Sequence, residues 1–275
     1  MSAAASATAQ APVAARVWQR FTPRQRLSRF AVYLGLVSAI VASARTVEVI
    51  PEFLYDAPQQ VQDLLERMWP IAWHHYAGGV HDALVDTLHI ATLGTLMGIV
   101  MALPVGLAAA GNLVPNRIVN HLARLVLVSS RSVNSLVWAL LFVAVFGPGA
   151  IAGTLAIAFR SVGFVGKLVG EALEEADRGA IEALQAAGAP WASRLLWGYW
   201  PQIKPAFWSI ALFRWDINVR ESAVLGLVGA GGIGMALDTA MNLFQWDRVA
   251  LVLFAIFVVV VVAELVVTRI RQRIL

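Results

Sequence analysis

The segment "LHIATLGTLMGIVMALPVGLAAA", residues 88–110, contains no formally charged side chain unless His89 is protonated. A transmembrane helix needs about 20 mostly apolar residues to cross the hydrocarbon core of a bilayer, so this segment is long enough to span one. The whole chain is similarly apolar, with 59% hydrophobic and 14% charged residues, whereas soluble domains contain about 25% charged residues. We therefore expect an all-α membrane protein, because too few polar residues remain to cover a water-soluble globule.

Other segments are also apolar enough to cross a bilayer, which gives about six predicted transmembrane helices. The least apolar of them covers residues 205–227, because the charged run "RWDINVRES" interrupts it. The five additional predicted spans are residues 30–50, 125–146, 149–170, 205–227 and 249–267.

Basic residues orient these spans, because short cytoplasmic loops collect Lys and Arg. With the N-terminus inside, thirteen basic residues are cytoplasmic, and only Arg67 and Arg248 are external. We therefore expect both termini in the cytoplasm, as six spans allow. The thirteen are Arg16, Arg20, Arg24, Arg26, Arg29, Arg117, Arg124, Arg178, Arg194, Lys204, Arg269, Arg271 and Arg273.

The chain divides into four parts before any motif is considered. Residues 1–29 form a basic cytoplasmic N-terminus that we expect to be disordered, and residues 30–50 form the first span. A cleavable signal peptide is the alternative, because a basic run precedes the apolar stretch and "ASA" follows at residues 42–44. Residues 51–83 are an external segment with apolar residues at helical spacing, expected to lie along the membrane surface. Residues 84–273 contain the remaining spans.

A loop between the fourth and fifth spans, residues 171–205, carries a motif: "EALEEADRGAIEALQAAGAPWASRLLWGYWPQIKP". It resembles the EAA loop of the membrane subunits of ABC importers, in which E-A-A-x-x-x-G is followed by nine residues and I-x-L-P. The matching residues are Glu182, Ala183, Gly188 and Pro201. The departures are Leu184 for Ala, Gly198 for Ile and Trp200 for Leu.

Local sequence supports a rigid projection at this loop. Residues 182–187 are strong helix formers, and Gly188 is able to take a positive φ just past their end. A second short helix is expected over residues 190–196, because proline suits a first helical turn. The resemblance implies that Glu182, Ala183, Gly188 and Pro201 couple the chain to an ATPase subunit. An ordinary amphipathic loop is the alternative.

The resemblance covers residues 84–273 and narrows to the phosphonate branch of these permeases. It rests on "RSVNSLVWALLFVAVFGPG" (131–149), "GFVGKLVGEALEEADRGAIEAL" (163–184) and "FRWDINVRESAVLGLVGAGGIG" (213–234). Val133 and Asn134 stand where that branch often has Ile-Pro.

This resemblance implies a type I ABC importer permease with about six transmembrane helices in the bacterial cytoplasmic (inner) membrane. It also implies a homodimer that works with two ATPase subunits and an external or periplasmic binding protein. The implied substrate is a phosphonate or a related oxyanion such as phosphite or a phosphate ester. The chain itself is then no enzyme and binds no cofactor, because ATP and Mg belong to the partner ATPase.

The glycines of "GAGGIG", residues 229–234, spell the dinucleotide-binding pattern G-x-G-x-x-G. That pattern requires a preceding buried strand inside a βαβ unit, and no such unit surrounds it here. No G-x-x-x-x-G-K-[ST] occurs either, so the chain has no P-loop for ATP. We expect Gly229, Gly231, Gly232 and Gly234 to form a packed bend or a gate.

Several charged residues fall inside predicted spans, where each costs about 2.5 to 3.5 kcal/mol on insertion scales. One interpretation is a water-filled translocation pathway whose arginines bind a tetrahedral oxyanion. The other is internal pairing of Arg214 and Arg220 with Asp216 or Glu221. Arg131 has no acidic neighbour in sequence, which favours the pathway for that residue. The predicted pathway residues are Arg131, Asn134, Arg160, Arg214 and Arg220.

Other functions are less well supported by the sequence. The basic residues form no stripe, so we expect no nucleic-acid partner, and the five histidines form no recognised metal-ligand set. No nucleophile and base stand together as in an active site. The remaining alternatives are an ABC permease for phosphate or an amino acid, an ATP-independent secondary transporter and a membrane scaffold. A secondary transporter is expected to show inverted repeats, which the sequence lacks.

Overall fold

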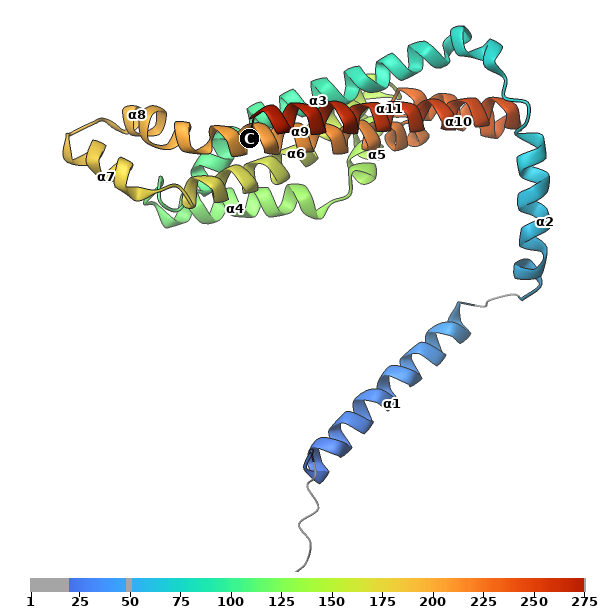
Figure 1. Cartoon of the computed structure of the whole chain (residues 1–275), viewed down its shortest axis with the longest axis horizontal. Helices are drawn as coiled ribbons and strands as arrows, with labels where there is room; N and C mark the ends of the chain where they lie inside the picture. Colours follow the sequence, from blue (N-terminus) through green and yellow to red (C-terminus); the bar gives the residue numbers. More distant parts are fainter. Residues whose placement is uncertain (1–19, 48–50, 275) are drawn as a thin grey trace, which may run out of the picture. The chain divides into compact units, whose positions relative to one another are not determined.

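A computed structural model describes residues 20–47 and 51–274, and all regular structure in these ranges is helical (Figure 1). The expectation of disorder for residues 1–29 falls outside the described residues for residues 1–19 and is wrong for residues 23–29, which are helical. The described residues fall into two units, divided after Val61.

The first helix, α1 (Pro23–Thr46), covers residues 30–46 of the first predicted span. It begins at Pro23 after Thr22, which forms a capping box with Gln25, and none of its residues is buried within the chain. The amphipathic helix α2 (Pro51–Arg67) follows in the sequence. Its exposed apolar side chains include Phe53, Leu54, Val61 and Leu65. The predicted helix in the external segment is therefore present, and its position on a membrane surface stays a prediction.

The second unit is built around four long helices that run side by side: α3 (His81–Ala109), α6 (Ala150–Glu174), α9 (Trp200–Leu225) and α11 (Trp246–Ile274) (Figure 1). Helix α6 packs against α3, α4, α5 and α9 and is the centre of the unit. The shorter elements are η1 (Trp73–His75), η2 (Tyr76–Val80), α4 (Arg117–Ser132), α5 (Ser135–Phe146), α7 (Arg178–Ala186), α8 (Trp191–Ser193), η3 (Arg194–Tyr199), η4 (Gly226–Val228) and α10 (Ile233–Asn242).

Small residues allow α3 and α6 to pack backbone to backbone, as is common in membrane proteins. Gly94 lies against Ile157, and Gly98 lies against Ser161. A Cβ added at Gly106 would lie 2.8 Å from the carbonyl oxygen of Gly166. The two helices therefore meet along their length with no room for larger side chains.

The predicted membrane character agrees with this arrangement. Within residues 20–47 and 51–274, five helical segments are long and apolar enough to cross a bilayer, and a sixth results if the bent pair α4 and α5 counts as one span. The segments are residues 23–46, 73–109, 150–174, 191–242 and 246–273.

The predicted span over residues 125–146 is not a single straight helix. Helices α4 and α5 meet at an angle of 88°. Val133 is extended, with φ −91° and ψ 133°, and the side chain of Asn134 accepts a hydrogen bond from the backbone N–H of Leu136 at 3.1 Å. The chain therefore starts a new helix at Ser135, because Asn134 provides an N-cap.

Gly106→Ala tests the close packing of α3 and α6. The added methyl group overlaps the backbone of Gly166, and such overpacking typically costs about 1–3 kcal/mol. We expect the purified variant to unfold at a lower temperature than the wild type in detergent. Gly35→Ala is the matched control, because a Cβ there has no atom within 4 Å and alanine is the better helix former. An unchanged melting temperature for Gly106→Ala would show that the two helices have room to separate.

Candidate functional site

The predicted coupling motif folds into an elbow, residues 177–202, that projects from one end of the long helices (Figure 1). Its first arm is α7, which begins at Arg178, earlier than expected, because the carboxylate of Asp177 accepts a hydrogen bond from the backbone N–H of Gly179 at 3.1 Å. The exposed side chains of Glu182 and Ala183 lie on this arm.

Gly188 ends the first arm as predicted, with φ +74°. The backbone N–H of Ala189 donates to the carbonyl oxygen of Leu184, and that of Gly188 donates to Gln185, each at 3.0 Å. These two bonds form a Schellman motif, which requires a residue in the left-handed region at the position of Gly188. The sharp turn of the elbow therefore depends on this glycine.

The second arm differs from the prediction of a separate helix over residues 190–196. Helix α8 begins at Trp191 and continues through the π-helical turn η3 into α9. Pro201 lies directly after η3, at the start of α9, and does not interrupt the helix.

Gly198, which departs from the motif, has a packing role. A Cβ at this position would lie 3.3 Å from Leu184 and 3.4 Å from Ile181 on α7. The two arms therefore touch at a glycine. Gln202 braces them further: its side-chain oxygen accepts from the backbone N–H of Asp177 at 2.8 Å, and its amide donates to the Asp177 carbonyl at 3.3 Å.

The break between α4 and α5 lies against the middle of α6. The hydroxyl of Ser130 donates to the carbonyl oxygen of Phe159 and accepts from the backbone N–H of Gly163 at 3.1 Å. A Cβ at Gly163 would lie 2.9 Å from the backbone nitrogen of Arg131. The predicted pathway residues Arg131 and Asn134 are therefore brought to the same level of α6 as Arg160.

A buried polar network joins α3, α6 and α9. Arg214 is 2% exposed, and its Nε donates to the hydroxyl of Ser161 at 2.9 Å. The amide of Asn218 donates to Thr95 Oγ1 at 2.7 Å and to Ser161 Oγ at 3.2 Å. Arg214 is therefore part of the helix interface, and its predicted role in a translocation pathway stays a prediction.

Glu221 connects this network to Arg160. One carboxylate oxygen lies 3.5 Å from Arg160 Nη1 and the other lies 3.5 Å from Arg214 Nη2. Arg160 Nη1 also donates to the hydroxyl of Ser135, in the first turn of α5, at 3.2 Å. The sequence predicts Glu221 only as a counter-ion for the nearby Arg214 and Arg220. The ion pair between Glu221 and Arg160 of α6 is not apparent from the local sequence, because 61 residues separate the two.

Arg220 forms an ion pair with Asp216 one helical turn away. Internal pairing, one of the two interpretations left open for the 214–221 cluster, is therefore present. Transport roles for these residues stay predictions.

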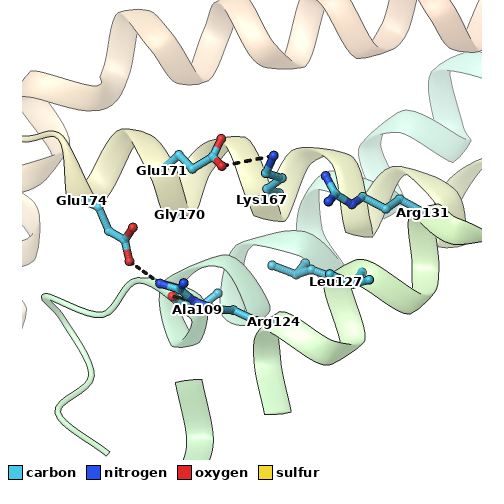
Figure 2. A pocket seen from close by; sticks show the side chains of 9 residues that line it. Ala109, Arg124, Leu127, Arg131, Lys167, Gly170, Glu171 and Glu174 are labelled. Atoms are coloured by element: carbon cyan, nitrogen blue, oxygen red, sulfur yellow. Dashed lines mark hydrogen bonds and ion pairs between the residues drawn. The ribbon is translucent and has the colours of Figure 1, made fainter. Parts of the chain in front are cut away.

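A groove of about 170 Å³ lies between α4 and α6, and the α4 residues that line it precede the break (Figure 2). Arg124 pairs with Glu174 at 2.7 Å, and Lys167 pairs with Glu171 at 3.2 Å. Arg131 lines the same groove and forms no ion pair with a residue that the structure describes. Arg124, Lys167, Glu171 and Glu174 were not predicted here, although the spacing of Lys167 and Glu171 indicates a pair on one helix face.

The glycine-rich segment forms a tightly packed bend between α9 and α10. Gly229, Gly231 and Gly232 have φ of +83°, +85° and +73°, and a Cβ at Gly231 would lie 2.8 Å from Ala150. Gly234, already in α10, has no room for a Cβ against Gly226. The packed bend is thus observed, and gating stays a prediction. The pattern precedes a helix and follows one, so it lacks the strand that dinucleotide binding requires.

Comparison with known proteins gives a consistent result. Residues 94–275 match the family described as "Binding-protein-dependent transport system inner membrane component". The chain is 34% identical over 250 residues to the phosphate-import permease protein PhnE of Mycolicibacterium smegmatis, covering 91% of this chain and 47% of that protein. It is 41% identical over 181 residues to the phosphite transport system permease protein PtxC of Stutzerimonas stutzeri, covering 66% of each. The chain thus spans about half the length of the first relative.

Solved structures share the fold. An inward-facing structure of the MetNI methionine ABC transporter gives a TM-score of 0.62 at 22% identity, over 71% of this chain and 96% of that chain. An amino acid ABC transporter with histidines gives a TM-score of 0.62 at 20% identity, over 74% of this chain and 97% of that chain. The predicted type I ABC importer permease architecture is therefore confirmed.

Ser161→Ala tests the buried network. The substitution removes the acceptor of Arg214 Nε and of the Asn218 amide, and a buried unsatisfied donor costs about 1–3 kcal/mol. We expect a clear loss of thermal stability in detergent. Thr239→Ala is the control, because that hydroxyl is exposed and bonds only within its own helix. Equal stability of both variants would contradict a structural role for the network.

Proposed function

The chain belongs to the binding-protein-dependent transport system inner membrane component family, and we propose that it is the membrane-spanning permease of an ATP-driven importer for a phosphonate or related oxyanion. One observation carries the choice of substrate class: Arg160 lies beside the α4–α5 break near the middle of a membrane-spanning helix. A guanidinium offers forked donors that match a tetrahedral oxyanion. The relatives named for phosphate and phosphite transport support the same class.

The elbow is the proposed site of coupling to an ATPase. Its exposed first arm carries Glu182 and Ala183, and its turn is fixed by Gly188. A rigid projection of this kind transmits movement of the ATPase to the membrane helices without changing its own shape. We propose that two copies of the chain assemble with two ATPase subunits, which hold ATP and Mg, and with an external binding protein. In the proposed assembly, both termini and the elbow face the cytoplasm. The chain itself catalyses no reaction.

The proposed pathway passes the α4–α5 break. Arg131 and Asn134 flank the break, Arg160 reaches it through Ser135, and the charged groove of Figure 2, which Arg131 lines, continues along α4 and α6. Arg214 is buried next to this region and pairs with Glu221, and Arg220 pairs with Asp216. The glycine bend at residues 229–234 lies at the opposite end of α9 from the elbow, where a gate on the external side would act.

Reconstitution tests the function directly. We expect proteoliposomes containing the chain, its ATPase and its binding protein to accumulate methylphosphonate, phosphite or inorganic phosphate only when ATP is present. Methionine is the control solute, because a probable D-methionine permease of Pasteurella multocida is a more distant relative at 27% identity. Uptake by the chain alone without ATP would contradict the proposal and favour a secondary transporter. Uptake of methionine in place of the oxyanions would contradict the substrate class.

Gly188→Val tests the coupling role of the elbow. Gly188 has a positive φ that a β-branched residue adopts only with strain, although no atom within 4 Å blocks a Cβ. We expect membrane insertion to remain intact while ATP-driven uptake falls to background. Ala186→Val, on the exposed end of α7, is the control and should keep most uptake. Normal uptake by Gly188→Val would refute the assignment.

Arg131→Ala tests the pathway. Removal of an unpaired cation beside the break weakens attraction for an anion, and loss of one charge-assisted contact corresponds to about a tenfold effect. We expect uptake about tenfold slower, with the ATPase still bound in pull-down experiments. Arg67→Ala, on α2, provides the comparison. If uptake by Arg131→Ala equals that of the control, Arg131 is structural.

A further inference from the structure

We infer that Arg160 and Glu221 form an exchange pair for the transported oxyanion. The free edge of the Arg160 guanidinium binds the anion, and Glu221 is the resident counter-ion that keeps this binding weak enough for release. The inference rests on the proposed function, and it adds Glu221 as a residue that sets affinity.

The cluster contains one more positive than negative charge. Its cations are Arg160, Arg214 and Arg220, and its carboxylates are Asp216 and Glu221. Asp216 is occupied by Arg220, so Glu221 must serve both remaining arginines. Ionisable groups at bilayer depth are costly unless they are paired. An added anion is therefore the missing partner of this cluster.

The excess charge is available on Arg160 and not on Arg214. Arg214 is 2% exposed, bonded to Ser161 and packed 5.5 Å from the centre of the Phe164 ring, so it is held in place. Arg160 is 29% exposed. Both of its contacts, with Ser135 and Glu221, use the single nitrogen Nη1.

The remaining edge of Arg160, formed by Nε and Nη2, makes no hydrogen bond to any residue between 20 and 274 that the structure describes. Two N–H groups on one guanidinium edge match two oxygens of a phosphonate, phosphite or phosphate. The site also adjoins Ser135 in the first turn of α5, whose N-terminal end carries a partial positive charge. The donor geometry of Arg160 and the positive charge around it thus favour the same class of ligand, an oxyanion.

The carboxylate of Glu221, which Arg160 and Arg214 share, explains how the oxyanion is released. The distances of 3.5 Å from Glu221 to both arginines are longer than those of a tight charge-assisted bond. When the oxyanion is present, it compensates Arg160 and Glu221 compensates Arg214. When the oxyanion leaves, Glu221 again shares its charge with Arg160. Without Glu221 the anion would face two uncompensated arginines and would be bound more tightly.

The test is equilibrium binding of radiolabelled inorganic phosphate and methylphosphonate to the permease–ATPase complex in nanodiscs, without the binding protein. We expect Arg160→Lys to weaken binding about tenfold, because lysine keeps the charge but loses the fork. We expect Glu221→Gln to strengthen binding about tenfold and to slow ATP-driven uptake, because release becomes limiting. Arg67→Lys and Glu66→Gln are matched controls on the exposed α2 and should bind like the wild type.

Each outcome bears on a different claim. Wild-type affinity in Arg160→Lys, or unchanged or weaker binding in a Glu221→Gln complex that still retains its ATPase, would overturn the exchange pair. If Glu221→Gln fails to assemble, Arg160→Lys decides alone, because it keeps the charge that Glu221 pairs with. ATP-driven oxyanion uptake by the wild type with no detectable binding to the permease would overturn this inference and leave the proposed function standing. Absence of that uptake would overturn the proposed function itself.

Discussion

Arg214 imposes the constraint on which the rest of the structure depends. A guanidinium that is 2% exposed inside a membrane helix must have every donor satisfied by nearby groups. Ser161 of α6 accepts from its Nε and Glu221 of α9 pairs with its Nη2, and Asn218 extends the network to Thr95 of α3. Three spans are thus held in one register by polar contacts, in a phase where apolar side chains gain little by leaving lipid for one another.

These contacts require close backbones, which explains the distribution of small residues. Gly98 lies against Ser161, so the serine hydroxyl reaches the polar network between α3 and α9. Gly163 admits the end of α4 against α6, so the break before α5 occurs beside Arg160. Backbone outside a helix is tolerated at membrane depth only where protein or water surrounds it. The break therefore agrees with a polar passage and not with a lipid-facing position.

Features determined by nearby residues could be predicted from the sequence. Apolar length gave the spans, and Gly188 at the end of a helix-forming run gave the turn of the elbow. Features determined by distant residues could not. The span over residues 125–146 contains one charged residue, Arg131, and no glycine or proline, and its 88° break depends on support from α6 as well as on the cap at Asn134. The pairing of Arg160 with Glu221 exists only because α6 and α9 are neighbours, which no spacing reveals.

A single helix connects the elbow to the proposed anion site. Helix α9 runs without interruption from Pro201, beside the elbow, to Glu221, a distance of about 30 Å at 1.5 Å per residue. That length matches the thickness of a bilayer core. The brace between Gln202 and Asp177 joins α9 to the first arm, so displacement of the elbow displaces the start of α9 as well. We propose that α9 carries motion of the elbow to its far half, where a small shift of Glu221 changes which arginine it neutralises.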